Sequence, residues 1–125
     1  MKSPGHQQHP NHKVLEKRLD QRLRVEVGGD LVADSTDVVE VDEDGYPPRF
    51  YFPRSDVHMD KLARSETTSQ CPFKGIANYY AIRTDGPTIS DAVWTYEDPY
   101  EEHEALRNRV AFWEGQKPEI AIRRS

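Results

Sequence analysis

Short apolar runs, interrupted about every ten residues by turn-forming residues, are the sequence feature that most constrains this fold. At residues 23–27, Leu and Val alternate with Arg and Glu, which is typical of a strand with one buried face. Gly28-Gly29 follows and predicts a tight hairpin. Further strands are predicted at residues 31–33, 38–41, 50–52, 76–83 and 89–96. We therefore expect a mainly β chain, a small single-domain β-sandwich or partly open barrel with one short helix.

The remaining segments have a weaker pattern. Residues 13–22 fit one or two turns of helix or a lead into the first strand, and residues 65–70 fit a polar loop. Asp98-Pro99 is typical of a helix start and predicts a short helix to about residue 108. Residues 110–113 and 119–123 predict a closing hairpin around Gly115.

The first 13 residues predict a disordered tail ahead of one β-rich domain at residues 14–125. After Met1 this segment holds Pro, Gly, Gln, Asn and His but no aliphatic side chain. Its histidines, His6, His9 and His12, recur every three residues. Because a flexible tail does not preorganise ligands, we expect no metal site there. We also expect no bound cofactor in the rest of the chain.

The charge balance argues against two classes of partner. With 17 basic and 22 acidic residues, the formal net charge is −5, so we expect no nucleic-acid binding, which requires neutralising several phosphates. No apolar run approaches the roughly 20 residues that cross a bilayer, so we expect no membrane association. One cysteine and a polar first segment favour a cytoplasmic protein. The oligomeric state is left open.

Two motifs carry a family resemblance: GYPPRFYFPRSDVHMD at residues 45–60 and CPFKG at residues 71–75. With the aromatic pair Tyr79-Tyr80 and the run VWTY at residues 93–96, they resemble the domain-of-unknown-function 427 family. The resemblance covers roughly residues 24–122. It implies a small, mostly β domain of bacteria and fungi, comparable in some respects to a β-tent fold, and it implies no activity.

A nucleotidyltransferase-like label is attached to that family, and this chain departs from what the label would require. Nucleotidyltransferases of the common type need a Gly-Ser pair for the phosphates and two aspartates, one residue apart, that hold a divalent metal. Asp42 and Asp44 have that spacing, but no Gly-Ser turn precedes them. We therefore expect no metal site at this turn either.

Cys71 is the strongest candidate for chemistry. It stands three residues before Lys74, and a nearby ammonium favours the thiolate, which is the nucleophilic form. Convergence of Lys74 and Arg54 on Cys71 would make an electropositive pocket. The alternative is that Cys71 packs as a small hydrophobic residue.

Arg54, Asp56 and His58 alternate along the chain and would share one side of an extended segment. Arg54 then suits a carboxylate or phosphate, and Asp56 and His58 would form an acid–base couple for proton transfer. The alternative is that Arg54 and Asp56 brace the loop through a salt bridge and backbone hydrogen bonds.

Aromatic side chains with polar tips would form a stacking surface for a planar ligand if they faced a cleft. The alternative is that they fill a core short of Leu and Ile. They are Tyr51, Tyr79, Tyr80, Trp94 and Tyr96.

Three functional hypotheses follow. The first is binding of a small anionic or planar molecule in a pocket near Cys71 and Arg54, with Tyr80, Trp94 and Tyr96. The second is an enzyme of transferase or hydrolase type with Cys71 as nucleophile, supported by Lys74 and Asp56. The third is an accessory interaction domain without a small-molecule site.

Overall fold

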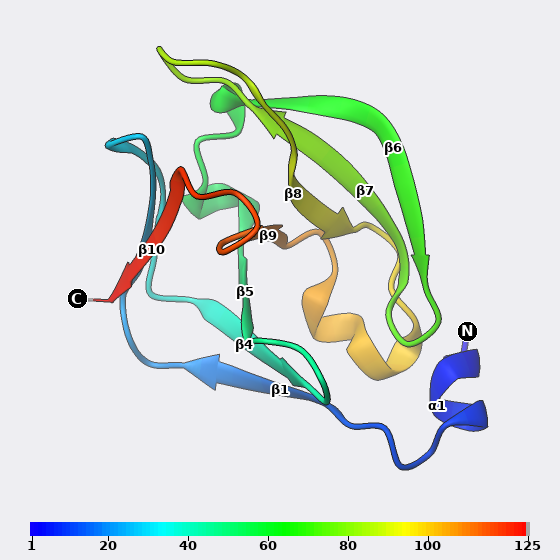
Figure 1. The fold of residues 1–125 in the computed structure, drawn as a ribbon. Coiled ribbons are helices and arrows are strands. Elements are labelled where there is room, and N and C mark those ends of the chain that lie inside the picture. Colours follow the sequence, from blue (N-terminus) through cyan, green and yellow to red (C-terminus); the bar gives the residue numbers. More distant parts are fainter. Residues whose placement is uncertain (125) are drawn as a thin grey trace.

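Two antiparallel sheets form the protein in a computed structural model that describes residues 1–124 (Figure 1). The larger sheet has seven strands in the order β1-β4-β5-β9-β8-β7-β6, and the smaller has three in the order β10-β2-β3. The strands are β1 (Val14–Leu19), β2 (Leu23–Val27), β3 (Asp30–Ser35), β4 (Val38–Glu43), β5 (Arg49–Phe52), β6 (Leu62–Cys71), β7 (Gly75–Ile82), β8 (Ile89–Tyr96), β9 (Val110–Phe112) and β10 (Ile120–Arg124). The predicted mainly β fold is confirmed.

The helical segments are short. One α-helix, α1 (Pro4–Gln8), lies near the N-terminus. The others are 3₁₀ helices: η1 (Arg54–Asp56), η2 (Met59–Lys61) and η3 (Glu101–Leu106). The helix predicted from Asp98-Pro99 is thus a 3₁₀ segment, and its interior residue His103 leaves helical geometry. No helix among residues 1–124 has the length and apolar character needed to span a bilayer.

The large sheet is covered on both faces along its central strands. One face packs against the small sheet in a core that includes Phe52, Val93 and Phe112. Their chain neighbours Tyr51, Trp94 and Ala111 lie in a second apolar cluster on the opposite face, as the two-residue period of a strand requires. The two faces therefore have separate side-chain sets, and the second set lines a cleft.

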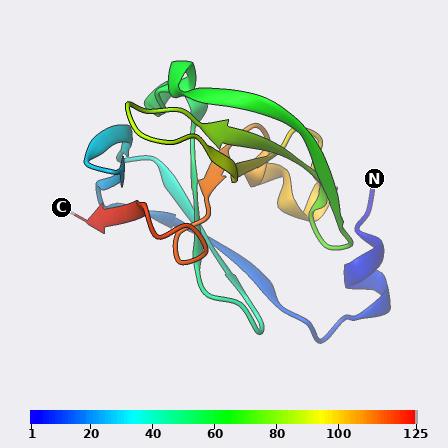
Figure 2. The ribbon, with the colours of Figure 1, turned by 45° about the horizontal axis from the view of Figure 1, so that its top comes forward.

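The large sheet is strongly curved, and β6 and β7 arch over one side of the molecule (Figures 1 and 2). The register shifts between Arg64 and Thr68 in β6, and again between Tyr80 and Ile82 in β7. Asp91, in β8, has a φ of 49°, a conformation uncommon for a residue with a side chain. Irregularities of this kind bend strands and increase their twist, so they account for the arch.

Two sequence predictions about the strands are wrong. Residues 65–70, predicted to be a polar loop, belong to β6, which is an edge strand and can keep polar side chains because one of its sides faces solvent. Residues 110–113 and 119–123, predicted to pair with each other, lie in different sheets. β9 pairs with β5 and β8, whereas β10 pairs with β2.

The N-terminal region also differs from its composition-based prediction. Residues 14–19, where helix and strand were both open, form β1 against β4. Residues 4–8, within the predicted disordered tail, form α1, and Ser3 and Gly5 are buried. The reason is local: the Ser3 hydroxyl and the Gly5 backbone N–H both donate to the Pro72 carbonyl in the 71–75 turn, and no apolar periodicity reveals such contacts.

The core between the two sheets depends on the aromatic pair Phe52 and Phe112. Their ring centroids lie 5.7 Å apart in an edge-to-face arrangement, and Phe52 has no exposed surface. We expect Phe52→Ala to lower the free energy of unfolding by about 3–5 kcal/mol, because it leaves a cavity among fixed neighbours. Urea unfolding measures this loss. Tyr46→Ala, at an exposed position, should change stability by no more than about 0.5 kcal/mol, and equal losses for the two variants would contradict this account of the core.

Candidate functional site

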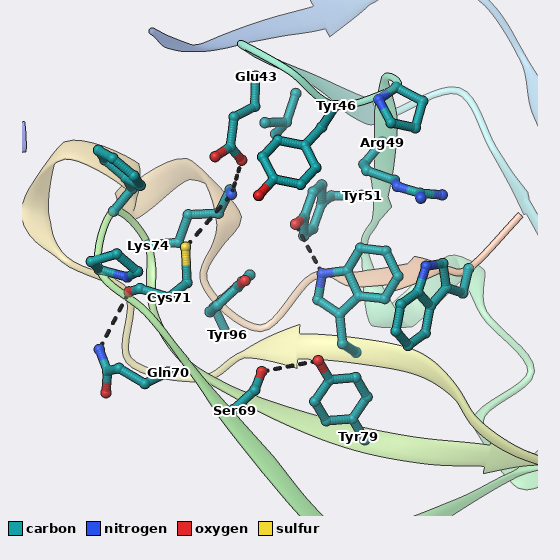
Figure 3. A pocket seen from close by; sticks show the side chains of 16 residues that line it. Glu43, Tyr46, Arg49, Tyr51, Ser69, Gln70, Cys71, Lys74, Tyr79 and Tyr96 are labelled. Atoms are coloured by element: carbon teal, nitrogen blue, oxygen red, sulfur yellow. Dashed lines mark hydrogen bonds and ion pairs between the residues drawn. The ribbon is translucent and has the colours of Figure 1, made fainter. Parts of the chain in front are cut away.

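A cavity of about 450 Å³ opens on the face of the large sheet that the small sheet leaves uncovered. Figure 3 shows its lining side chains, which come from β4 to β8, from the turns after β4 and β6, and from the residue after β9. The lining residues are Val41, Glu43, Tyr46, Pro47, Arg49, Tyr51, Ser69, Gln70, Cys71, Pro72, Phe73, Lys74, Tyr79, Trp94, Tyr96 and Trp113. Its volume is within the range of small-molecule sites.

Tyr51, Trp94 and Trp113 form an aromatic wall of the cavity. Trp94 donates its indole N–H to the Tyr51 hydroxyl at 3.0 Å, and the two rings meet edge to face. Trp94 also packs edge to face against Trp113, with ring centroids 5.8 Å apart. Burial raises the pKa of both Tyr51 and Tyr96, so both phenols stay neutral at physiological pH. The wall is therefore fixed and uncharged.

Lys74 and Cys71 lie together at one end of the cavity, on the turn formed by residues 71–75 (Figure 3). Lys74 is buried, and its ammonium donates to Glu43 Oε1 at 2.6 Å. The same ammonium lies 3.8 Å from Cys71 Sγ. Gly75 closes the turn with a φ of +128° and 3.3 Å between a Cβ built at this position and Asp98 O, so a side chain here would be strained.

Glu43 balances the charge at this end of the cavity. Burial acts to raise the pKa of Glu43, but hydrogen bonds from Lys74 and His12 outweigh it and hold that pKa below its usual value. The carboxylate is thus ionised at neutral pH. Lys74 and Glu43 form an ion pair that is largely shielded from solvent. His12 Nε2 also lies 3.0 Å from Glu43 Oε2.

Arg49 is the other cation in the cavity, and it has no such partner. Its Nη1 donates to the Glu114 backbone carbonyl at 2.9 Å, and its guanidinium carbon lies 5.7 Å from the centre of the Trp94 ring. Burial lowers the pKa of Arg49, although arginine remains charged in proteins. Within residues 1–124 no carboxylate comes within ion-pair distance of it. In Figure 3 Arg49 and Lys74 lie on opposite sides of Tyr51.

The structure brings together four of the seven site residues predicted from the sequence. Cys71, Lys74, Trp94 and Tyr96 all line the cavity. Arg54, Asp56 and Tyr80 lie outside it. Tyr80 points away because it follows Tyr79 in β7, and successive side chains of a strand take opposite faces.

Arg54 and Asp56 miss the cavity because residues 54–56 form η1 rather than an extended segment. Asp56 accepts a hydrogen bond from the Ser35 hydroxyl at 2.6 Å. Asp56 therefore connects η1 to the end of β3, which is a bracing role through a serine hydroxyl.

Arg54 ties η1 to β7, to β8 and to the segment before β9. Its guanidinium donates to the Asn108 carbonyl at 2.7 Å, and to the Tyr80 hydroxyl and Thr95 Oγ1 at 3.1 Å each. It also lies over the Tyr80 ring, 5.7 Å from the centroid. These contacts correspond to the bracing alternative for Arg54.

Sequence reasoning missed Arg49, Glu43 and Trp113 as members of the site. A signal for the first two was present in the period of the strands. Arg49 is two residues before Tyr51, so both share a face of β5, and Glu43 is two residues after Val41 in β4. Trp113 follows the last residue of β9, and no local pattern placed it.

The acidic residues at 42–44 do not converge. Glu43 pairs with Lys74, and Asp44 accepts a hydrogen bond from the Lys13 backbone N–H at 2.8 Å. Among residues 1–124 no group of three or more His, Cys, Asp or Glu side chains is placed to hold a metal ion.

Comparison with protein-family models places the chain in a family. A family model described as a domain of unknown function (DUF427) matches residues 16–122. No curated protein matches the chain. The matched region holds every residue that lines the cavity and leaves out α1.

Arg54 can be tested as a structural residue. We expect Arg54→Lys to lower the free energy of unfolding by about 1–3 kcal/mol, because an ammonium cannot replace three hydrogen bonds made by a planar fork. The measurement is urea unfolding, with Arg83→Lys at an exposed site as the matched control. A stability loss no larger than that of the control would show that Arg54 does not brace the fold.

Proposed function

Because the chain belongs to the family described as a domain of unknown function (DUF427), we propose a function from its cavity: it binds a small planar anion there. The anionic group faces Arg49, and the planar part lies against the aromatic wall of Tyr51, Trp94 and Trp113. This retains the hypothesis of an anionic or planar ligand near Cys71 and replaces Arg54 with Arg49 as the recognising cation.

The observation that carries the proposal is the unpaired guanidinium of Arg49. A partly buried cation loses hydration, and proteins compensate this loss with a carboxylate or another anion. Lys74 has Glu43 for this purpose, whereas Arg49 has a single backbone carbonyl and the face of Trp94. An anionic ligand would complete the set of partners for Arg49, and the planar fork suits a carboxylate or phosphate.

The charge of the cavity supports an anion over a cation. Its lining holds two basic residues, Arg49 and Lys74, and one acidic residue, Glu43. This balance of +1 contrasts with the formal charge of −5 on the whole chain. Local charge of opposite sign to the rest of the surface favours entry of an anion at this point.

The shape and chemistry of the wall support a planar ligand. Rings in mutually fixed edge-to-face contacts present faces and edges that a flat molecule can stack on. At the other end, the Lys74–Glu43 pair is balanced and Ser69 and Gln70 are neutral. That end suits uncharged hydrogen-bonding groups rather than a second anion.

The proposal can be tested with three probes of matched size. The chain has two tryptophans, and both line the cavity, so their fluorescence reports on occupancy. We expect 2-naphthoate to quench it saturably, and 2-naphthamide and the saturated decahydro-2-naphthoate to bind at least about tenfold more weakly. Each lacks one recognised feature, the charge or the plane, and a charge-assisted hydrogen bond is worth about 1.5–3 kcal/mol.

The variant Arg49→Gln should weaken 2-naphthoate at least about tenfold and leave 2-naphthamide nearly unchanged. Arg83→Gln, at an exposed site outside the cavity, is the control and should behave like the parent protein. Equal binding of naphthoate and naphthamide, or an Arg49→Gln variant with undiminished naphthoate affinity, would contradict recognition of an anion by Arg49. No saturable binding of any probe would favour an accessory interaction domain.

A second candidate function uses Cys71 as a nucleophile. The Lys74 ammonium 3.8 Å from Sγ is the observation that favours it, because a close cation stabilises a thiolate. In this mechanism Sγ would attack an electrophilic carbon of a bound substrate and release its leaving group, as in a transferase or hydrolase. Glu43, however, shares the Lys74 charge at 2.6 Å. That competition makes us place binding ahead of catalysis.

The reactivity of Cys71 separates the two functions. If Glu43 offsets the effect of Lys74, the parent protein should react with iodoacetamide at pH 7 no faster than a free thiol, and Glu43→Gln should react faster. The measurement is alkylation followed by intact-protein mass spectrometry, with Cys71→Ser as the blank. A parent rate well above that of a free thiol would instead support the nucleophile.

A further inference from the structure

The segment before β1 lies against the 71–75 turn, which forms one wall of the cavity. Ser3 is fully buried, and its hydroxyl donates to the Pro72 carbonyl at 2.8 Å. The Gly5 backbone N–H donates to the same carbonyl at 2.8 Å. A Cβ at position 5 would lie 2.7 Å from the Pro72 oxygen, so this close contact requires glycine.

A pair of histidines also ties this segment to η3 and, through Glu16, to β1. His6 Nε2 and His103 Nε2 lie 2.8 Å apart, and His103 Nδ1 lies 2.7 Å from Glu16 Oε2. His103, in η3, is almost completely buried. A nitrogen–nitrogen hydrogen bond contains one proton, so one ring donates and the other accepts. Full protonation of both rings would direct two N–H groups at each other.

The third contact of the segment lies next to its junction with β1. His12 stacks on Phe73 with ring centroids 4.4 Å apart, and its Nε2 lies 3.0 Å from Glu43 Oε2. Because Glu43 is ionised, His12 holds the end of the segment nearest β1 through a contact separate from the His6–His103 pair.

We propose that residues 3–9 form a clamp on the 71–75 turn that is docked at neutral pH and released in mild acid, while His12 stays attached to Glu43. The release occurs when His6 and His103 both carry a full set of protons. The clamp adjoins the cavity at Phe73, which lines it. The His6 ring packs edge to face on the Phe73 ring, with ring centroids 5.0 Å apart. Docking of the segment does not depend on the proposed ligand.

The charges around the histidine pair agree with this direction. Burial, followed by the charge of His103, lowers the pKa of His6 below its ordinary value of 6.5, although Glu102 and Glu43 act to raise it. A histidine with a lowered pKa stabilises the docked state above its free pKa, and that stabilisation is lost as the pH falls below 6.5. The titratable or charged groups facing the pair from the packed elements are Lys2, His12, Glu16, Glu43, Lys74 and Glu102.

Hydrogen exchange of the full chain at pH 7.5 and 5.0 tests the clamp, with labelling times scaled for the intrinsic exchange rate. We expect protection of the segment holding the Gly5 and His9 amides to fall about tenfold in acid, because each pH unit below the free pKa lowers the docking constant by at most a factor of ten. Segments from β7 and β8 should keep their protection and show that the fold is intact.

Two variants make the test specific. The side-chain amide of His6→Gln can donate to or accept from His103 at either pH, so its protection should change by less than about twofold. His9→Gln alters a histidine of the same segment whose ring makes no hydrogen bond within residues 1–124, and it should behave like the parent. Protection that does not change with pH in the parent, or that falls equally in His6→Gln, would overturn the clamp.

Discussion

The central strands of the large sheet are buried on both faces, and the rest of the structure depends on that constraint. Each of these strands places one apolar side chain against the small sheet and its chain neighbour in the apolar cluster on the opposite face: Phe52 and Tyr51, Val93 and Trp94, Phe112 and Ala111. A one-residue slip in register would exchange the two sets. It would put tyrosine and tryptophan polar groups into the dry core. The core thus fixes which aromatics face the cavity.

The same constraint explains how much the sequence could predict. Alternation of apolar and polar residues identified most strands, because this two-residue period does not depend on which strands pair. It could not identify partners: β9 and β10 are near in sequence but lie in different sheets, which only long-range packing decides. Tyr79 and Tyr80 both had a suitable side chain, and their assignment depended on which face became the cleft. Arg54 was misplaced because a 3₁₀ turn ended the extended segment on which its orientation relied.

Arg49 and Lys74 show that a charged residue without an ion-pair partner is a better guide to a binding site than its residue type alone. Lys74 belonged to the most conspicuous motif, yet its buried ammonium is already matched by Glu43. Removing one partner of such a buried pair costs about 3–5 kcal/mol, which gives Lys74 a structural role whatever else it does. Arg49 carries its charge into the same cavity without a carboxylate. A missing ion-pair partner can be identified only from the three-dimensional structure, because the fold determines which side chains lie close to the charge.

The boundary of the family match separates the proposed clamp from the proposed binding site. Every residue lining the cavity lies within residues 16–122, whereas residues 3–9 lie outside. The cavity is therefore a feature of the part that this chain shares with the family model, and the clamp adds to it from outside. The two meet at Phe73, which lines the cavity and packs against His6 and His12. A change in the protonation of the histidine pair would therefore reach the cavity through the 71–75 turn, without altering the strands that hold Arg49 and the aromatic wall.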